Sequence, residues 1–288
     1  YLSENEEAYE EMRKKDIISK ENFEKFYNYK DRVLGGINIV LNTKLEKECY
    51  NTKVKEIKEK YGKIHFITYA NERFQRAKER LCKEAKYFNV FETIRGYGPE
   101  DLDKDFYNRF SSILQMPRIG GYGIWRPYII KNKLNEINDG EYLIYLDAGC
   151  TINNKGINRF DEYLSKFNNT VYGIISFQYK HLSERHWTTK EIFKYFDIDI
   201  NSNIATSGQS PSGIIIMKKN NHLLNIIDKW YNAIFDNVLL FTDYYNNNNQ
   251  HSEFRDNRHE QSVLSVIRKK YGSIVMKNDI DVHPYNTE

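Results

Sequence analysis

The sequence predicts an α/β sandwich with a mostly parallel central sheet, preceded by an N-terminal helical extension. From residue 61 to residue 288, short apolar runs of strand length alternate with longer stretches of helical periodicity. Residues 1–60 are charged and helical in character, and they open on SENE, in which Ser3 and Glu6 have the spacing of a capping box. The chain therefore divides into an extension, 1–60, and one domain, 61–288.

Each expected element has its own local signal. The strands are runs rich in Ile, Val, Phe and Tyr, whereas the helices space their apolar residues by three and four between charged ones. Strands are expected at 63–70, 89–94, 142–147, 171–177 and 213–219, and helices at 73–85, 101–114, 125–137, 222–235 and 260–272. The low-complexity tract YYNNNNQHSEF, residues 244–254, is expected to form a mobile loop.

Composition excludes several classes of protein. With 288 residues, of which 40% are hydrophobic, the chain can bury a sizeable core. Its 43 Lys and Arg nearly cancel its 40 Asp and Glu, which argues against nucleic acid as a partner. Three cysteines without CxxC spacing argue against a zinc site and a disulfide framework and favour a reducing compartment.

The sequence shows no targeting or membrane signal of its own. Its apolar runs are far shorter than the roughly 20 residues that a membrane span needs, and its first residues have no signal-peptide pattern, so no integral membrane segment is expected. The chain begins at Tyr1 rather than at methionine, as a fragment of a longer protein would.

Asp147 is the first candidate for chemistry. It ends the apolar run YLIYLD and is followed by Ala148 and Gly149. Ligands of parallel sheets collect at the carboxyl ends of the strands, and small residues there let an anionic group approach the backbone. A carboxylate beside a diphosphate is a usual ligand of Mg²⁺ or Mn²⁺, which points to nucleotide-sugar transfer. The alternative is a turn former or helix cap.

Five stretches together resemble a family. They are KIHFITYANERF, GGYGIWRPYIIKNKLNEINDGEYLIYLDAGCTIN, HLSERHWTTKEIF, SGIIIMKKN and FRDNRHEQSVLSVIRKKYG. In this order, over roughly residues 61–285, they look like a GT-A-fold glycosyltransferase of the group found in capsule or lipopolysaccharide gene clusters and in large DNA viruses. The resemblance implies a Rossmann-type nucleotide-diphospho-sugar fold, a divalent metal and a donor such as a UDP-sugar. A cytoplasmic or virus-associated location is expected.

The resemblance also implies a metal motif, D-x-D, from which this chain departs. Gly149 stands where the second acid is expected. Asp147 would then hold Mn²⁺ or Mg²⁺ with diphosphate oxygens, water and a distant ligand such as His283, and metal-independent transfer is the alternative. For His283, the alternative is an ordinary surface histidine.

Residues at two crossovers are candidates for binding the donor. In the resembling fold the first crossover holds the base and ribose, which implies contacts from Thr68, Ala70 and Arg76, although Arg76 could equally lie on a solvated helix face. Arg126, beside Pro127 at a helix start, offers a guanidinium fork and free amides to a phosphate or a sugar hydroxyl.

Two polar loops are candidates for binding the sugar or acceptor. In HLSERHWTTKEIF an aromatic plane beside polar groups suits a sugar ring, so Trp187, Thr188 and Lys190 are expected to contact it; zinc bound by the two histidines is the weaker alternative, because no further ligand is suitably spaced. Gln209, in the loop before the 213–219 strand, could meet the acceptor, although a turn explains this loop equally well.

Glu260 is the second candidate for catalysis. RHEQS resembles the H-D-Q-S stretch of the family, with Glu260 in the acidic place and His259 beside it. The resemblance implies a general base in an inverting enzyme or a contact with the donor sugar in a retaining one. The alternative is a glutamate that favours the helix dipole.

The function expected from these features is transfer of a sugar from a nucleotide diphosphate, with a glycan or glycoprotein as the acceptor. The alternative is a catalytically silent module that keeps the fold and binds nucleotides or glycans.

Overall fold

A four-stranded sheet lies at the centre of the computed structural model, which describes residues 44–280. Its strands run in the order β2-β1-β3-β5. They are β1 (Ile64–Tyr69), β2 (Thr93–Tyr97), β3 (Tyr142–Leu146) and β5 (Ile214–Lys218). β1 pairs in parallel with β2 and β3, whereas β5 is antiparallel to β3. The predicted α/β class with a mostly parallel sheet is therefore confirmed.

Two strands form a separate small sheet. β4 (Ile175–Gln178) pairs in parallel with β6 (Ile274–Lys277), a strand that the sequence did not predict. The run at 171–177 was expected to join the central sheet, but only a single bridge between Ile174 and Met217 connects it there.

The strand expected at 89–94 begins later than its apolar residues indicate. Asn89 ends the preceding helix with a φ of 56°, and Val90 and Phe91 then pack into the core before β2 starts. β2 itself is an edge strand whose residues are mostly exposed or half-buried, so its polar sequence carries little strand signal.

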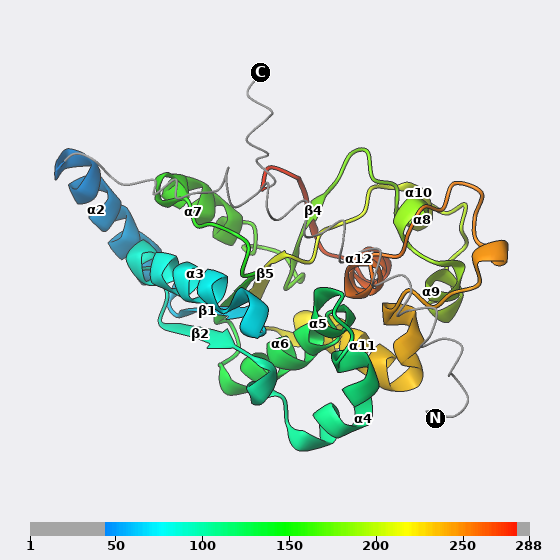
Figure 1. The fold of residues 1–288 in the computed structure, drawn as a ribbon. Helices are drawn as coiled ribbons and strands as arrows, with labels where there is room; N and C mark the ends of the chain where they lie inside the picture. Colours follow the sequence, from blue (N-terminus) through cyan, green and yellow to red (C-terminus); the bar gives the residue numbers. More distant parts are fainter. Residues whose placement is uncertain (1–43, 281–288) are drawn as a thin grey trace.

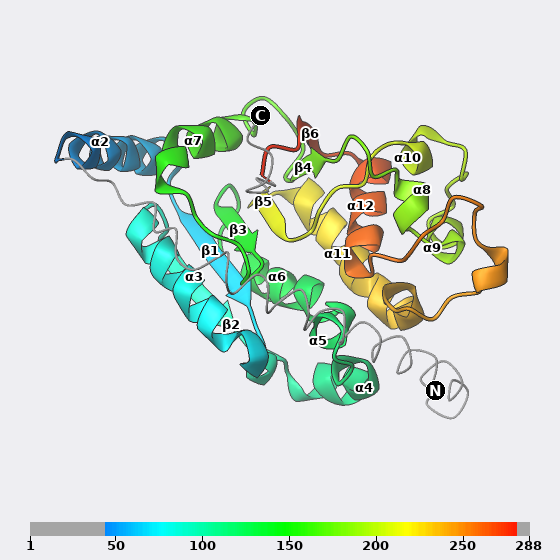
Figure 2. The same cartoon turned by 45° about the horizontal axis from the view of Figure 1, so that its top comes forward.

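Helices cover both faces of the sheet. They are α2 (Lys44–Tyr61), α3 (Gln75–Phe88), α4 (Lys104–Leu114), α5 (Ile119–Tyr122), α6 (Trp125–Glu136), α7 (Ile157–Ser165), α8 (Glu184–Trp187), α9 (Lys190–Tyr195), α10 (Asn203–Thr206), α11 (Asn221–Asn237) and α12 (Glu260–Tyr271). Figures 1 and 2 show α2, α3 and α7 on one side of the strands and α6 and α11 on the other.

The alternation of side chains along the strands separates two cores. In β3, Tyr142 and Ile144 pack into a cluster with residues of α2, α3 and α7, whereas Leu143 and Tyr145 point into a cluster with residues of α4, α6, α11 and α12. Successive residues of a strand face opposite sides, so the apolar runs of the central strands bury side chains on both faces, as a covered parallel sheet requires.

Part of the expected N-terminal extension packs on the domain. α2 lies within 1–60 except for its last residue, Tyr61, and its Ile57 is fully buried in the cluster that contains Tyr142 and Ile144. Lys53 and Tyr61 also contact Asp161 of α7, at 2.7 Å and 2.5 Å. Residues 1–43 lie outside the described part of the chain, and the boundary at residue 60 stays a prediction. Among the described helices, no stretch is long and apolar enough to cross a membrane.

The contribution of α2 to the fold can be measured with one substitution. Ile57→Ala is expected to lower the free energy of unfolding by about 2 to 5 kcal/mol, because it removes a fully buried side chain and leaves a cavity. Urea unfolding followed by circular dichroism measures it. Lys55→Ala, on the exposed side of the same helix, should cost less than about 0.5 kcal/mol; equal effects of the two variants would show that α2 does not pack as described.

Candidate active site

The carboxyl ends of β1 and β3 mark the point where the strand order reverses. The chain leaves β1 for β2 on one side and later enters β3 on the other, and open α/β sheets bind ligands in the crevice at such a point. β1 ends at Tyr69 and β3 at Leu146. Ala70 and Asp147, which follow them, therefore stand beside this crevice, and the predicted position of Asp147 at a strand's carboxyl end is confirmed.

Asp147 is held from two directions. Its backbone N–H donates to Gly213 O at 2.8 Å, and its Oδ1 accepts hydrogen bonds from Arg126 at 2.6 Å and from Tyr145 at 2.5 Å. Burial raises the pKa of Tyr145 well above its ordinary value, so its phenol keeps the proton that it donates. The Asp147 side chain is still 43% exposed, so a ligand can reach it.

The loop after β3 is fixed by α3. Arg80 donates to the carbonyl oxygens of Ala148 and Cys150 at 3.0 Å and 2.8 Å. Glu84, one turn further along, accepts from the backbone N–H of Ile152 at 3.0 Å. This pair was not predicted from the sequence, although Arg80 and Glu84 have the i,i+4 spacing of a helical ion pair.

Gly149 lies at the open side of this loop. It is exposed, and a β-carbon placed on it would meet no atom of the described residues within 4 Å. The space that the sequence predicted is therefore present at Gly149, whereas Ala148 is buried.

Arg126 connects the two candidate catalytic carboxylates. It lies in the first turn of α6 and is 2% exposed. Its guanidinium donates to Asp147, to Ser212 Oγ at 3.0 Å and to Glu260 Oε1. Burial by itself would lower its pKa, but Asp147 and Tyr145 outweigh burial and leave that pKa raised. The guanidinium of Arg126 thus binds carboxylates of the protein in this structure. The sequence had suggested that it would bind a phosphate or a sugar hydroxyl.

Glu260 begins α12 and is almost fully buried. Its Oε1 accepts from Arg126 and from Ser212 Oγ, the latter at 3.1 Å. Its Oε2 is buried without a hydrogen-bond partner among the described residues. A buried carboxylate oxygen without a donor is costly, so Oε2 is an acceptor that the described residues leave unsatisfied.

Residues 119–123 form a left-handed turn that passes next to Glu260. Five consecutive residues have positive φ: Ile119 (54°), Gly120 (59°), Gly121 (88°), Tyr122 (56°) and Gly123 (74°). Such a run is rare because each non-glycine residue in it costs about 1–2 kcal/mol. A β-carbon on Gly123 would lie 2.6 Å from Glu260 Cγ, and one on Gly121 would lie 2.6 Å from a backbone atom of α4. The glycines thus allow α6 to start directly beside Glu260.

His259 joins the start of α12 to a buried ion pair. Its Nε2 lies 2.7 Å from Asp243 Oδ1, and Arg118 donates to Asp243 Oδ2 at 2.8 Å. Burial lowers the pKa of His259 despite the hydrogen bond to Asp243. The ring is therefore neutral at pH 7, and Asp243 accepts its Nε2 proton. The φ of His259 is 57°, an uncommon value for a non-glycine residue that persists only where the surroundings fix it.

Thr188 and Gln209 lie inside a polar network centred on Glu184, which is fully buried. Glu184 accepts from Thr188 at 2.7 Å, Gln209 at 2.9 Å and Ser265 at 2.5 Å, and it pairs with Lys269 at 2.7 Å. The network ties α8 and the loop before β5 to α12. The side chains of Thr188 and Gln209 are thus engaged within the protein in this structure.

The other candidates for binding the sugar lie nearer the surface. Trp187 is half-buried, and the Arg258 guanidinium lies 4.2 Å from its ring centroid. Lys190 begins α9, and its backbone N–H donates to Gln250 Oε1 at 2.9 Å.

The candidates at the end of β1 differ in their exposure to solvent. Thr68 and Ala70 are buried, whereas Arg76 is exposed in the first turn of α3. Thr68 Oγ1 has no hydrogen-bond partner among the described residues. Beside them lies an open pocket of about 440 Å³, lined in part by Tyr69 and Asn71.

Asp147 is the half-exposed acid that the crevice offers to a divalent cation. Within residues 44–280, no group of three His, Cys, Asp or Glu side chains is placed to hold a metal ion, and His283 lies outside the described residues. A single carboxylate such as that of Asp147 is enough to bind Mg²⁺ or Mn²⁺ where a diphosphate and water supply the remaining oxygen ligands.

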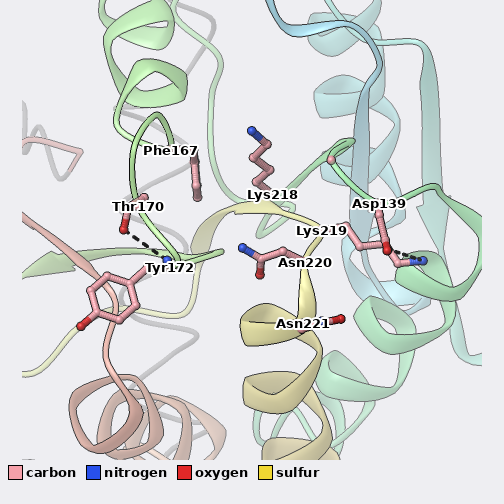
Figure 3. A pocket seen from close by; sticks show the side chains of 9 residues that line it. Asp139, Phe167, Thr170, Tyr172, Lys218, Lys219, Asn220 and Asn221 are labelled. Carbon is pink, nitrogen blue, oxygen red and sulfur yellow. Dashed lines mark hydrogen bonds and ion pairs between the residues drawn. The ribbon is translucent and has the colours of Figure 1, made fainter.

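A second pocket, of about 320 Å³, lies at the opposite end of β3 (Figure 3). Asp139 and Lys219 line it and are paired with each other at 3.7 Å. Asn220 caps α11 by accepting from the backbone N–H of Leu223. This pocket shares no lining residue with the cluster around Arg126.

Comparisons with known proteins assign the chain to no family. No protein-family model matches it, and no curated protein matches it in sequence. Among solved structures, a crystal structure of the galactosyltransferase LgtC in complex with donor and acceptor sugar analogues is similar over 74% of this chain and 73% of that chain. The two chains share 12% identity, and the TM-score is 0.35.

The pairing of Arg126 with Glu260 can be tested by unfolding. Arg126→Met is expected to lower the free energy of unfolding by about 3 to 5 kcal/mol, because it leaves the carboxylate of Glu260 buried without its cation. The double variant Arg126→Met with Glu260→Gln should recover part of this loss. If the double variant is as unstable as the sum of the two single ones in urea, the two side chains are not coupled.

The depressed pKa of His259 gives stability a pH dependence of definite sign. The folded-state pKa lies below the ordinary value of 6.5, so below that pH the unfolded chain binds more protons and the free energy of unfolding falls as the pH falls. In urea unfolding between about pH 7.5 and 5.5, His259→Gln should show a shallower fall than the unsubstituted protein. Identical slopes would mean that His259 titrates alike in both states.

Proposed function

We propose that the protein transfers a sugar from a nucleotide-diphosphate sugar, a UDP-sugar, to a hydroxyl group of a glycan or glycoconjugate. The observation that carries the proposal is the juxtaposition at the carboxyl ends of β1 and β3. There the half-exposed Asp147 and the open backbone at Gly149 lie beside a buried cluster that contains Glu260. The sequence resemblance to GT-A-fold glycosyltransferases supports the same reading.

The proposed donor site follows the strand ends. The base and ribose would lie at the end of β1, near Thr68, Ala70 and Arg76, and the diphosphate over Ala148 and Gly149. Mn²⁺ or Mg²⁺, held by Asp147 and the diphosphate, would neutralise charge on the departing nucleotide. Arg80 keeps the backbone of this loop in one conformation through its two carbonyl contacts.

The proposed chemical role of Glu260 rests on its Oε2. Arg126 and Ser212 occupy Oε1, so Oε2 would meet the reacting groups. In an inverting reaction it would take the proton of the acceptor hydroxyl, whose oxygen bonds to the sugar while the nucleotide diphosphate leaves with the electron pair of the broken bond. In a retaining reaction it would contact the donor sugar and stabilise its positive charge.

A second candidate function has one observation in its favour. Glu260 is 3% exposed and its charge is balanced by Arg126, as in a domain that binds nucleotides or glycans without turnover. Incubation with a panel of nucleotide sugars, with and without Mn²⁺, distinguishes the two functions, because only the transferase releases free nucleotide.

Glu260→Gln tests the catalytic assignment. The variant keeps the shape of the side chain but removes the base and the negative charge, so turnover should fall by about 10² to 10⁴ if proton transfer is the role of Glu260. Donor affinity, measured by calorimetry with UDP, should stay within about threefold. Glu59→Gln, on the exposed face of α2, is the control. A fall of less than about threefold at unchanged stability would leave Glu260 as a structural residue.

A further inference from the structure

A third pocket lies between the start of α9, the short helix η4 (Val238–Phe241) and the loop that carries the asparagine tract. Its volume is about 590 Å³. Tyr244, Tyr245 and residues 246–248 form one side of it, and Thr189 lies at its other side. In Figures 1 and 2 this orange segment runs beside α9. The tract that the sequence suggested to be a mobile loop is thus the wall of a pocket.

Hydrogen bonds to α9 and a ring contact within the loop hold this wall in place. Glu191 of α9 accepts from the backbone N–H of Asn246 at 3.2 Å and from Gln250 Nε2 at 2.8 Å. The Tyr245 ring meets Phe254 edge to face, with centroids 5.2 Å apart. The two hydrogen bonds to Glu191 therefore attach the loop to α9 without a ligand.

The chemistry of the lining selects a neutral, hydroxyl-rich ligand. Tyrosine rings offer flat apolar faces with a polar tip, and asparagine amides both donate and accept hydrogen bonds. Among the described residues that line the pocket there is no Lys or Arg. Its acidic member, Glu191, is already engaged by the loop. Such a lining suits the faces and hydroxyl groups of a sugar and offers a diphosphate no cationic side chain.

The pocket is connected to the candidate active site by one hydrogen bond. Tyr244 directly follows Asp243, which binds His259 at 2.7 Å, and His259 directly precedes Glu260. Asp243 and His259 are both buried. The wall of the pocket is therefore fixed relative to the carboxylate proposed to act on the acceptor.

We propose that this pocket is a subsite for a neutral oligosaccharide, the non-reacting part of the acceptor glycan. The inference rests on the proposed function and specifies its acceptor: an uncharged glycan of at least two sugars, one unit of which is held against Tyr244 and the asparagines.

The test is binding of neutral disaccharides to the full chain. Lactose, cellobiose, maltose and α-1,2-mannobiose are titrated one at a time and followed by saturation-transfer NMR, with UDP as a separate ligand. At least one disaccharide should bind, and Tyr244→Ala should weaken it by about tenfold or more because the stacking face is lost. Tyr244→Phe keeps the ring and should stay within about threefold. UDP affinity should be unchanged in both variants.

A second variant keeps the test decisive if Tyr244→Ala does not fold. Asn248→Trp, at an exposed position of the wall, fills the pocket from the solvent side and should abolish disaccharide binding without changing UDP affinity. The inference is overturned if no disaccharide binds at about 10 mM, or if folded Tyr244→Ala or Asn248→Trp binds as the unsubstituted protein does.

The two proposals fail in different ways. Disaccharide binding that depends on Tyr244, without nucleotide release from any donor, would refute the transferase and leave the glycan subsite standing. Nucleotide release without disaccharide binding would do the reverse.

Discussion

The buried guanidinium of Arg126 is the group on which the candidate site depends. It joins carboxylates from two separate elements, Asp147 after β3 and Glu260 at the start of α12. Removing such charges from water is costly, and their attraction offsets the cost only where the geometry and the surrounding hydrogen bonds are good. Ser212 and Tyr145 supply those hydrogen bonds.

Much of the surrounding fold serves to bring these three charges together. The left-handed turn at 119–123 directs the chain into α6 at the point where Arg126 is needed, and Gly123 leaves room for Glu260. The network around Glu184 fastens the loop before β5 to α12. The pairing of His259 with Asp243 fixes the residue directly before Glu260.

The sequence predicted those parts of the site that depend on local pattern. An apolar run ending in Asp147 indicated a strand whose carboxyl end carries an acid, and RHEQS indicated a helix that starts at Glu260. The sequence could not indicate that Arg126 lies between these residues, because their contact joins positions 21 and 134 residues apart. Arg80 was missed for the same reason, since its partners lie in the loop after β3.

Two features of the fold were also beyond local reasoning. β4 and β6 pair across about 100 residues of chain, and a short polar strand such as β2 gives little period-two signal at a sheet edge. The asparagine tract resembled a mobile loop because its composition cannot form a core. Its hydrogen bonds to Glu191, which belongs to another segment, could not be predicted from that composition.

The proposed roles of Asp147, Gly149 and Glu260 all depend on binding of a nucleotide diphosphate at the carboxyl ends of β1 and β3. A crystal structure of the chain with UDP tests it most directly. We expect the diphosphate beside Gly149 and Asp147, the base at the end of β1, and Arg126 still between Asp147 and Glu260. UDP bound instead at the opposite end of β3, near Lys218 and Lys219, would contradict the assignment of the site.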